Sequence, residues 1–280
     1  MSRIIVADSS ANLPNSWDED FASAPLKIIV NHHEYIDDES LNMEAMLQDL
    51  QEADDASTTA CPSSGEWMQT FNEADEVFGV TITSALSGCY NSACVAADMY
   101  TFEHPNRKVF ILDSLTTGPE MELLVEKYRE LIKAGEPFET IKAKIQEYLK
   151  GTHLLFSLES LKNMAKNGRV SPAVAKAVSL LGIRIIGAAS DQGELEPLHK
   201  TKGEKRAIST LWKTMRERGF EGGKVRITHT NNLKAAEKLA EFVKEAFPTC
   251  DVNIRPNTGL CSYYAEPGNV MVGFEGAVRS

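Results

Sequence analysis

The chain has 280 residues and a formal net charge of -11, with an ordinary balance of apolar and charged residues. This length allows one large domain or two modest ones, each with a real hydrophobic core. The negative charge argues against nucleic acid or an anionic membrane surface as the main partner, because both require a basic face on the protein.

The sequence shows no targeting or metal-binding pattern. No apolar run approaches the roughly 20 residues that a membrane helix requires, so we expect no stable membrane insertion. The apolar stretch near the N-terminus is too short for a signal peptide, because the acidic Asp8 already interrupts it. Residues 1–8 instead predict a buried first strand. The five cysteines include no CxxC pair, which fits a reduced cytoplasm. The six histidines lack the spacing of a zinc site, and we predict neither a metal nor a cofactor.

The first half of the chain alternates short apolar stretches with longer helical periods. This alternation is typical of βαβ units and predicts a parallel sheet. The predicted helices are residues 41–53, 65–72, 86–100, 120–133 and 137–149. The predicted strands and apolar stretches are residues 3–7, 24–30, 77–82 and 108–112.

The second half contains several strand candidates that follow one another closely. A hairpin turn is predicted at residues 191–193, and clear helices at residues 202–218 and 233–247. Paired strands indicate an antiparallel or mixed sheet, so we predict an α/β protein with domains at residues 1–150 and 151–280. The strand candidates are residues 153–157, 182–189, 194–198, 224–229, 252–256 and 269–274.

Three predicted strands of the first half end in small polar residues, at residues 8–10, 83–84 and 113–114. In open α/β sheets, ligands collect outside the carboxyl ends of the strands. This placement predicts a ligand site at that edge of the sheet.

Residues 81–93, TITSALSGCYNSA, contain two candidate nucleophiles. Ser87 stands in a small polar turn, but the GxSxG elbow is absent, because Ala85 precedes it by two and Cys89 follows it by two. Cys89 stands where a helix start would lower its pKa, although nothing in the sequence nominates a base for it. A hydrolase using Ser87 or Cys89 therefore remains an alternative.

The same stretch also suits an anion. A helix beginning near Leu86 offers free backbone N–H groups and a favourable dipole. Ser84 and Ser87 add hydroxyl donors, and Gly88 lets a ligand approach the backbone closely. Alternatively, one of these serines only caps the helix. A binder of another small anion is thus a second alternative.

A second hydroxyl cluster lies at residues 57–67. Ser63 and Glu66 form a predicted capping box, which explains both residues without a ligand. Thr58 and Thr59 are not explained in this way, because they stand on an extended segment before Pro62.

Two further polar segments receive structural interpretations. Residues 8–10 predict an Asx turn that caps the next helix, in preference to a metal or phosphate site. Gly168 ends one predicted helix and Ser171 begins another, which leaves Arg169 on a tight exposed connection.

These segments, in this order, resemble the DegV family of bacterial fatty-acid-binding proteins. Each motif is weak by itself, but together they cover nearly the whole chain. The matching segments are residues 8–14, 25–28, 59–67, 83–93, 113–118, 161–171 and 193–208.

The resemblance implies a two-domain fold with a Rossmann-like parallel-sheet domain, a small insertion near residues 26–60 and a second α/β domain. It also implies a long-chain fatty acid between the domains, with its carboxylate on hydroxyls that match Thr59 and Ser84, beside Ser87 and Gly88. Some members of the family present this carboxylate to a separate ATP-dependent fatty-acid kinase. The implied protein is a cytoplasmic lipid-binding protein with no catalytic residues of its own.

The sequence departs from the family pattern near the implied head group. Tyr264 stands where the family often has a histidine, and it can still donate a hydrogen bond, so we include it in the ligand site. Glu266 stands in place of a glycine, and it would repel a carboxylate if it pointed inward. Cys61 and Cys89 replace glutamine and threonine.

A few basic residues cluster locally although the chain as a whole is acidic. We predict that these clusters are a docking surface for the partner kinase. We assign Arg169 and Lys202 to it, the latter where the family often has arginine, together with Lys200, Lys205 and Arg206. The alternative is that all of them are ordinary solvated charges.

Overall fold

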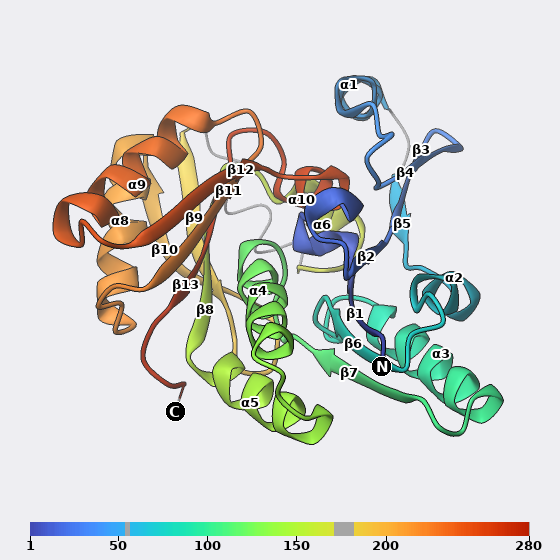
Figure 1. Ribbon diagram of the computed structural model, residues 1–280. Helices are drawn as coiled ribbons and strands as arrows, with labels where there is room; N and C mark the ends of the chain where they lie inside the picture. The colour runs from blue at the N-terminus through green and yellow to red at the C-terminus, as the bar shows by residue number, and fades with distance from the viewer. Residues whose placement is uncertain (54–56, 171–181, 280) are drawn as a thin grey trace.

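The structure is a computed structural model that describes residues 1–53, 57–170 and 182–279. Its strands form sheets of four, six and three strands, covered by helices (Figure 1). The predicted α/β fold class, with one parallel sheet and one mixed sheet, is confirmed. Among the described helices, none has the length and apolar character needed to cross a membrane.

The four-stranded sheet is fully parallel and forms the centre of the first half. Strand β6 is buried along its whole length, as expected for a parallel strand with helices on both faces. The order of strands is β2 (Phe21–Ala24), β1 (Arg3–Asp8), β6 (Glu76–Thr81) and β7 (Lys108–Asp113).

Alternate residues of this sheet enter two different cores. Ile5 and Phe78 face α4 (Pro119–Lys133) and α5 (Phe138–Lys150). Ile4 and Val77 face the opposite way, toward α2 (Ser64–Thr70) and α3 (Cys89–Glu103). Successive strand residues point to opposite faces, and both faces here are apolar, so the sheet is covered on each side. The predicted capping box of Ser63 and Glu66 at the start of α2 is confirmed.

Helix α3 begins at Cys89, three residues later than the predicted start at Leu86. The intervening residues form a turn in which Thr83 satisfies the backbone locally. Its carbonyl accepts from the Leu86 N–H at 3.2 Å, and its hydroxyl accepts from the Ala85 N–H at 3.2 Å. Threonine side chains offer such local alternatives to a helix, which the apolar pattern alone does not reveal.

A small three-stranded antiparallel sheet stands where the resemblance implies an insertion. Helix α1 (Met43–Glu52) lies beside it, and the Asn42 side chain caps that helix by accepting from the Ala45 N–H. Strand β5 brings Thr59 opposite Ile28. The strands are β4 (His33–Ile36), β3 (Lys27–Val30) and β5 (Thr58–Ala60).

The six-stranded sheet contains only strands that follow Lys150, whereas all strands of the other two sheets precede it. Among the described residues, no sheet combines strands from before and after residue 150, which is what a domain boundary at this residue requires. The boundary itself stays a prediction. Four of the five strand pairs in this sheet are antiparallel, and the fifth pair, β11 with β12, is parallel. The order is β10 (Leu195–Lys202), β9 (Ile183–Ala189), β8 (Thr152–Leu158), β13 (Val270–Glu275), β11 (Lys224–His229) and β12 (Asp251–Pro256).

Helices α8 (Glu204–Glu217) and α9 (Leu233–Ala246) pack on the face of this sheet away from α4 (Figure 1). The predicted hairpin turn is confirmed, since Gly193 has φ 78° between the antiparallel strands β9 and β10. Helix α6 (Lys162–Lys166) matches the helix predicted before Gly168. The helix predicted from Ser171 lies outside the described residues.

Helix α10 (Gly259–Ala265) was not predicted from the sequence. Nearly all of its residues are buried, so it has no polar face and no helical period. It lies in the middle of the molecule, near α6 and between the insertion and the six-stranded sheet (Figure 1). This position makes it part of the candidate site.

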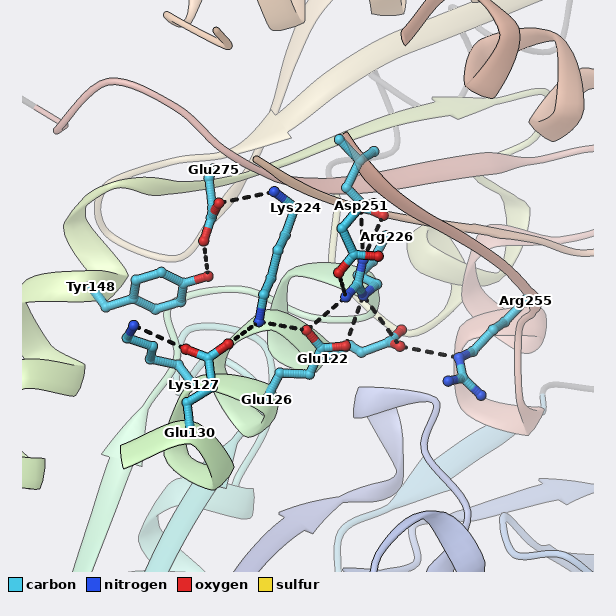
Figure 2. A network of polar contacts seen from close by, with 11 residues as sticks. Glu122, Glu126, Lys127, Glu130, Tyr148, Lys224, Arg226, Asp251, Arg255 and Glu275 are labelled. Atoms are coloured by element: carbon cyan, nitrogen blue, oxygen red, sulfur yellow. Dashed lines mark hydrogen bonds and ion pairs between the residues drawn. The ribbon is translucent and has the colours of Figure 1, made fainter. Parts of the chain in front are cut away.

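Helix α4 lies between the two large sheets and carries a network of charges toward β11 and β12 (Figures 1 and 2). The Arg226 guanidinium donates to both carboxylate oxygens of Glu126 at 2.8 Å. Arg255 donates to Glu122 at 3.1 Å, and Lys224 to Glu126 at 3.1 Å. Burial raises the pKa of Glu122 to about 7, despite the nearby Arg255 and Arg226. The two sheets therefore meet here through buried ion pairs.

Candidate functional site

A small apolar cavity of about 60 Å³ lies between the first sheet and α10. Its apolar lining residues come from both halves of the chain, and two of its polar lining residues, Thr59 and Tyr264, are hydrogen-bonded to each other. The apolar residues include Leu26, Ile82, Met164, Leu260 and Met271, and the polar ones include Thr59, Ser87, Thr117, Arg169 and Tyr264.

The volume of this cavity is well below the roughly 300–1,000 Å³ of typical ligand sites. An elongated ligand therefore enters only when lining side chains move. Met164 and Met271 suit this role, because methionine is unbranched and adopts many rotamers. A larger cavity of about 540 Å³ shares Leu86, Arg169 and Leu195 with the small one. Because the two cavities share these residues, we take the larger cavity as the entrance to the site and call it the mouth.

Thr59 and Tyr264 form the polar end of the site. The Thr59 hydroxyl and the Tyr264 phenol share a hydrogen bond of 2.8 Å, although 205 residues separate them. The neighbouring Tyr263 phenol bonds Ser57 at 2.8 Å and accepts from the Asn167 side chain at 2.7 Å. These bonds fix α10 against β5, so that Tyr264 faces the cavity with a hydroxyl that can donate or accept.

Ser87 and Ser84 lie in different surroundings. Ser87 lines the cavity, and its hydroxyl accepts from the Cys89 N–H at 3.3 Å at the start of α3. Ser84 is exposed and is not among the lining residues, and its N–H donates to Asp113 at 3.1 Å. Gly88 is the N-cap of α3 and is exposed. The geometry thus groups Ser87, in place of Ser84, with Thr59.

Arg169 and Lys202 also differ in their surroundings. Arg169 is half-buried at the mouth of the cavity and donates to the Leu86 carbonyl at 3.2 Å. Lys202 is exposed at the end of β10. The assignment of both residues to a docking surface stays a prediction, and Arg169 has an additional place beside the ligand cavity.

The polar ends of β1, β6 and β7 bond to one another. The buried Asp8 carboxylate accepts from the Ile82 N–H at 2.7 Å and the Ser10 N–H at 3.1 Å, which confirms the predicted Asx turn. Ser114 donates its N–H to the Thr81 carbonyl at 3.2 Å. These groups are therefore structural, and in the described part of the chain no cluster of acidic, cysteine or histidine side chains is arranged to hold a metal ion.

The geometry does not favour the hydrolase alternative for Ser87. The Ser87 hydroxyl donates to the Cys89 sulfur at 3.3 Å, and none of its hydrogen bonds within the described residues involves a histidine. A serine nucleophile requires a base within hydrogen-bonding reach. The small-anion alternative also fits poorly, because the cavity next to Ser87 is mainly apolar.

The family model for uncharacterised proteins of the DegV family matches residues 3–276. The chain belongs to the DegV family. A DegV domain-containing protein of Streptococcus pneumoniae is 39% identical over 275 residues, which cover 97% of this chain and 98% of that protein. The DegV resemblance seen in the sequence motifs is thereby confirmed.

Two solved DegV structures share the fold of this chain. A DegV family protein from Eubacterium eligens, loaded with heptadecanoic acid, is 41% identical with a TM-score of 0.96, and the match covers 99% of this chain and 100% of that one. The fatty acid kinase B3 protein of Streptococcus pneumoniae, loaded with linoleic acid, is 38% identical with a TM-score of 0.94 and the same coverage.

The sequence motifs do not identify every residue of the site. Tyr263, Ser57 and Asn167 position α10, and Cys261 and Thr117 line the cavity. The tyrosine pair next to a Gly-Leu-Cys segment is the one local signal, because two adjacent tyrosines in a buried stretch need hydrogen-bond partners. Those partners come from distant segments, which motif spacing does not reveal.

Proposed function

We propose that this protein binds a long-chain fatty acid, with the acyl chain in the apolar cavity and the carboxylate at its hydroxyl end. The observation that carries this proposal is an apolar cavity whose lining includes the hydrogen-bonded Thr59–Tyr264 pair. The two DegV structures loaded with heptadecanoic and linoleic acid support it, since their chains match this one almost completely.

The energetics assign different roles to the two ends of the ligand. About 14 buried methylenes contribute on the order of 11 kcal/mol before the costs of binding. Each hydrogen bond to the carboxylate contributes roughly 1.5–3 kcal/mol. The acyl chain thus dominates affinity, and the hydroxyls orient the ligand and prevent an unpaired buried charge.

At the head group, the carboxylate takes the place of the mutual bond between Thr59 and Tyr264 and accepts a hydrogen bond from each. Ser87 lies on the same cavity and offers a third hydroxyl, beside the Gly88 backbone. Arg169 supplies the nearest positive charge at the mouth. Ser84, which the family resemblance assigns to the carboxylate, is not one of these hydroxyls. It lies on the exposed turn before Ser87.

We further propose that the bound carboxylate is presented to a separate ATP-dependent fatty-acid kinase. The fatty acid kinase B3 protein, which matches the whole chain, supports this role. In such a system the kinase supplies the phosphoryl group, and the present chain holds and orients the acid. The exposed mouth around Leu86 and Arg169 gives the kinase access to the head group.

Mass spectrometry of lipid extracted from the purified protein tests the binding proposal. We expect a long-chain fatty acid in the extract, and saturable binding of linoleic acid by the delipidated protein. Absence of both results would refute the proposal.

The kinase proposal needs its own experiment. The loaded protein, ATP and a fatty-acid kinase catalytic protein should together yield an acyl phosphate that hydroxylamine traps as a hydroxamate. Omission of the kinase should abolish the product, and a product formed without the kinase would contradict the assigned division of roles.

A further inference from the structure

Two of the cysteines meet beside the candidate site. Cys61 follows β5 and is half-buried, and Cys89 is the first residue of α3 and is buried. The Cys61 sulfur lies against the turn before α3, only 3.4 Å from the point that a Cβ on Gly88 would occupy. Cys61 also packs against the hydrophobic cluster that contains Cys89, and both thiols are free in this structure.

A buried carboxylate completes this cluster. The Asp8 side chain interacts with the Cys89 thiol and is held in place by the Ile82 N–H at 2.7 Å. Burial raises the pKa of Asp8 to about 6. Cys61, Cys89 and Asp8 therefore lie close enough to influence one another's pKa values, with Cys61 the most exposed of the three.

The two thiols differ in acidity. The neighbouring Cys89 thiol lowers the pKa of Cys61 below its ordinary value. The neighbouring Cys61 and burial raise the pKa of Cys89 above its ordinary range. Cys61, the more accessible of the two cysteines, is therefore the one that more readily forms a thiolate. A thiolate is the form of cysteine that attacks a disulfide.

We propose that Cys61 and Cys89 are a dithiol site that a low-molecular-weight disulfide oxidises reversibly to an intramolecular disulfide. The Cys61 thiolate attacks one sulfur of the disulfide, forms a mixed disulfide and releases one thiolate. Cys89 then gives its proton to the Asp8 carboxylate, and its sulfur attacks the Cys61 sulfur and releases the second thiolate. The small molecule is reduced to two thiols, which take up the two protons, and the protein dithiol is oxidised.

The bond has a consequence for the ligand cavity, which rests on the proposed function. Cys61 is two residues from Thr59, and Cys89 is two residues from Ser87, so the disulfide joins two walls of the cavity. Drawing the sulfurs into bonding distance brings these walls closer together. We expect the oxidised protein to bind fatty acid about tenfold more weakly than the reduced protein.

Peptide mapping tests the dithiol site. The full-length protein is equilibrated with mixtures of oxidised and reduced glutathione, quenched with acid, alkylated and digested. We expect a Cys61–Cys89 disulfide that dithiothreitol removes. Cys89→Thr should stop at a mixed disulfide on Cys61, Cys61→Ser should not react at either position, and Cys94→Ser should behave as the unmodified protein.

Two outcomes would overturn the proposal: a stable mixed disulfide on Cys61 in the unmodified protein, or no oxidation of Cys61 at any glutathione ratio. Titration with linoleic acid before and after oxidation then measures the effect on the cavity. Equal affinities in the two forms would refute the link to the cavity while leaving the dithiol site intact. Failure of both forms to bind linoleic acid would refute the proposed function alone.

Discussion

The two halves of this chain meet in two regions that differ in chemistry. On one side, α4 presents Glu122 and Glu126 to Arg255 and Arg226, and these groups are largely withdrawn from water (Figure 2). On the other side, α10 meets β5 through neutral hydroxyl pairs such as Thr59–Tyr264, around a cavity.

These two contacts differ in the cost of separating them. Removing one partner of a buried ion pair leaves an uncompensated charge and costs about 3–5 kcal/mol. A neutral hydrogen bond contributes only about 0.5–1.5 kcal/mol net, and water or a ligand can replace it. The comparison therefore predicts that the α4 side stays closed while the cavity side opens for a ligand.

Breaking the charged side should have the largest effect. Arg226→Ala leaves Glu126 buried without its bidentate partner, so we expect a loss of about 3–5 kcal/mol in the free energy of unfolding. Urea denaturation measures this loss. Lys238→Ala, which removes the exposed pair with Glu241, is the control and should cost less than about 1 kcal/mol. Similar losses for both variants would contradict the comparison.

The charged side should also make stability depend on pH. The pKa of Glu122 is about 7 in the folded protein against an ordinary value of 4.5, so the folded chain holds this proton more tightly than the unfolded chain. The contribution of Glu122 to stability should therefore be fully present below pH 4.5 and fall by roughly 3 kcal/mol as the pH rises to 7, at about 1.4 kcal/mol per pKa unit.

Urea denaturation at several pH values tests this dependence, with Glu122→Gln as the decisive variant. A neutral side chain at this position should flatten the fall in stability. The raised pKa values of Asp8 and Asp37, both about 6, should leave a slope of the same sign at lower pH, so the variant should flatten the fall mainly between about pH 6 and 7. A slope that is unchanged in the variant would show that Glu122 is not its source.

On the cavity side, the two adjacent tyrosines form a matched pair of tests. Tyr264→Phe removes a donor to the proposed carboxylate and should weaken linoleic acid binding roughly tenfold or more, since a bond to a charged group contributes about 1.5–3 kcal/mol. Tyr263→Phe removes the bonds to Ser57 and Asn167 that position α10, so it should lower stability and cost less affinity than Tyr264→Phe. Isothermal titration compares the two, and equal affinity losses would argue against Tyr264 as a head-group ligand.

The smallest effect is expected at Glu266. Its φ is 56°, and its carboxylate accepts from the Asn163 N–H at 3.0 Å, at the start of α6. Glu266→Gly relieves the cost, roughly 1–3 kcal/mol, of holding a non-glycine residue at φ 56° and ψ 162°, but it also loses this bond. We expect a net change in stability of about 1 kcal/mol or less, and unchanged fatty-acid affinity. Glu266→Gln keeps the backbone strain and serves as the control in thermal unfolding.

Much of the fold could be predicted from local patterns. The buried strands of the parallel sheet, the capping box at Ser63 and the turn ending at Gly193 all depend on residues close together in sequence. Amphipathic helices such as α9 show a clear period because one face packs on a sheet and the other faces water. Helix α10 lacked that signal because it is buried on nearly all sides.

The sequence by itself determined the family, the two kinds of sheet and the segments that carry the hydroxyl residues. Only the tertiary structure decided which of these residues meet. It joined Thr59 to Tyr264, placed Ser87 instead of Ser84 on the cavity, and brought Cys61 against Gly88, next to Cys89. The physical reason is that these contacts depend on how α10 and α3 pack against the insertion, and such long-range packing leaves no periodic trace in the chain.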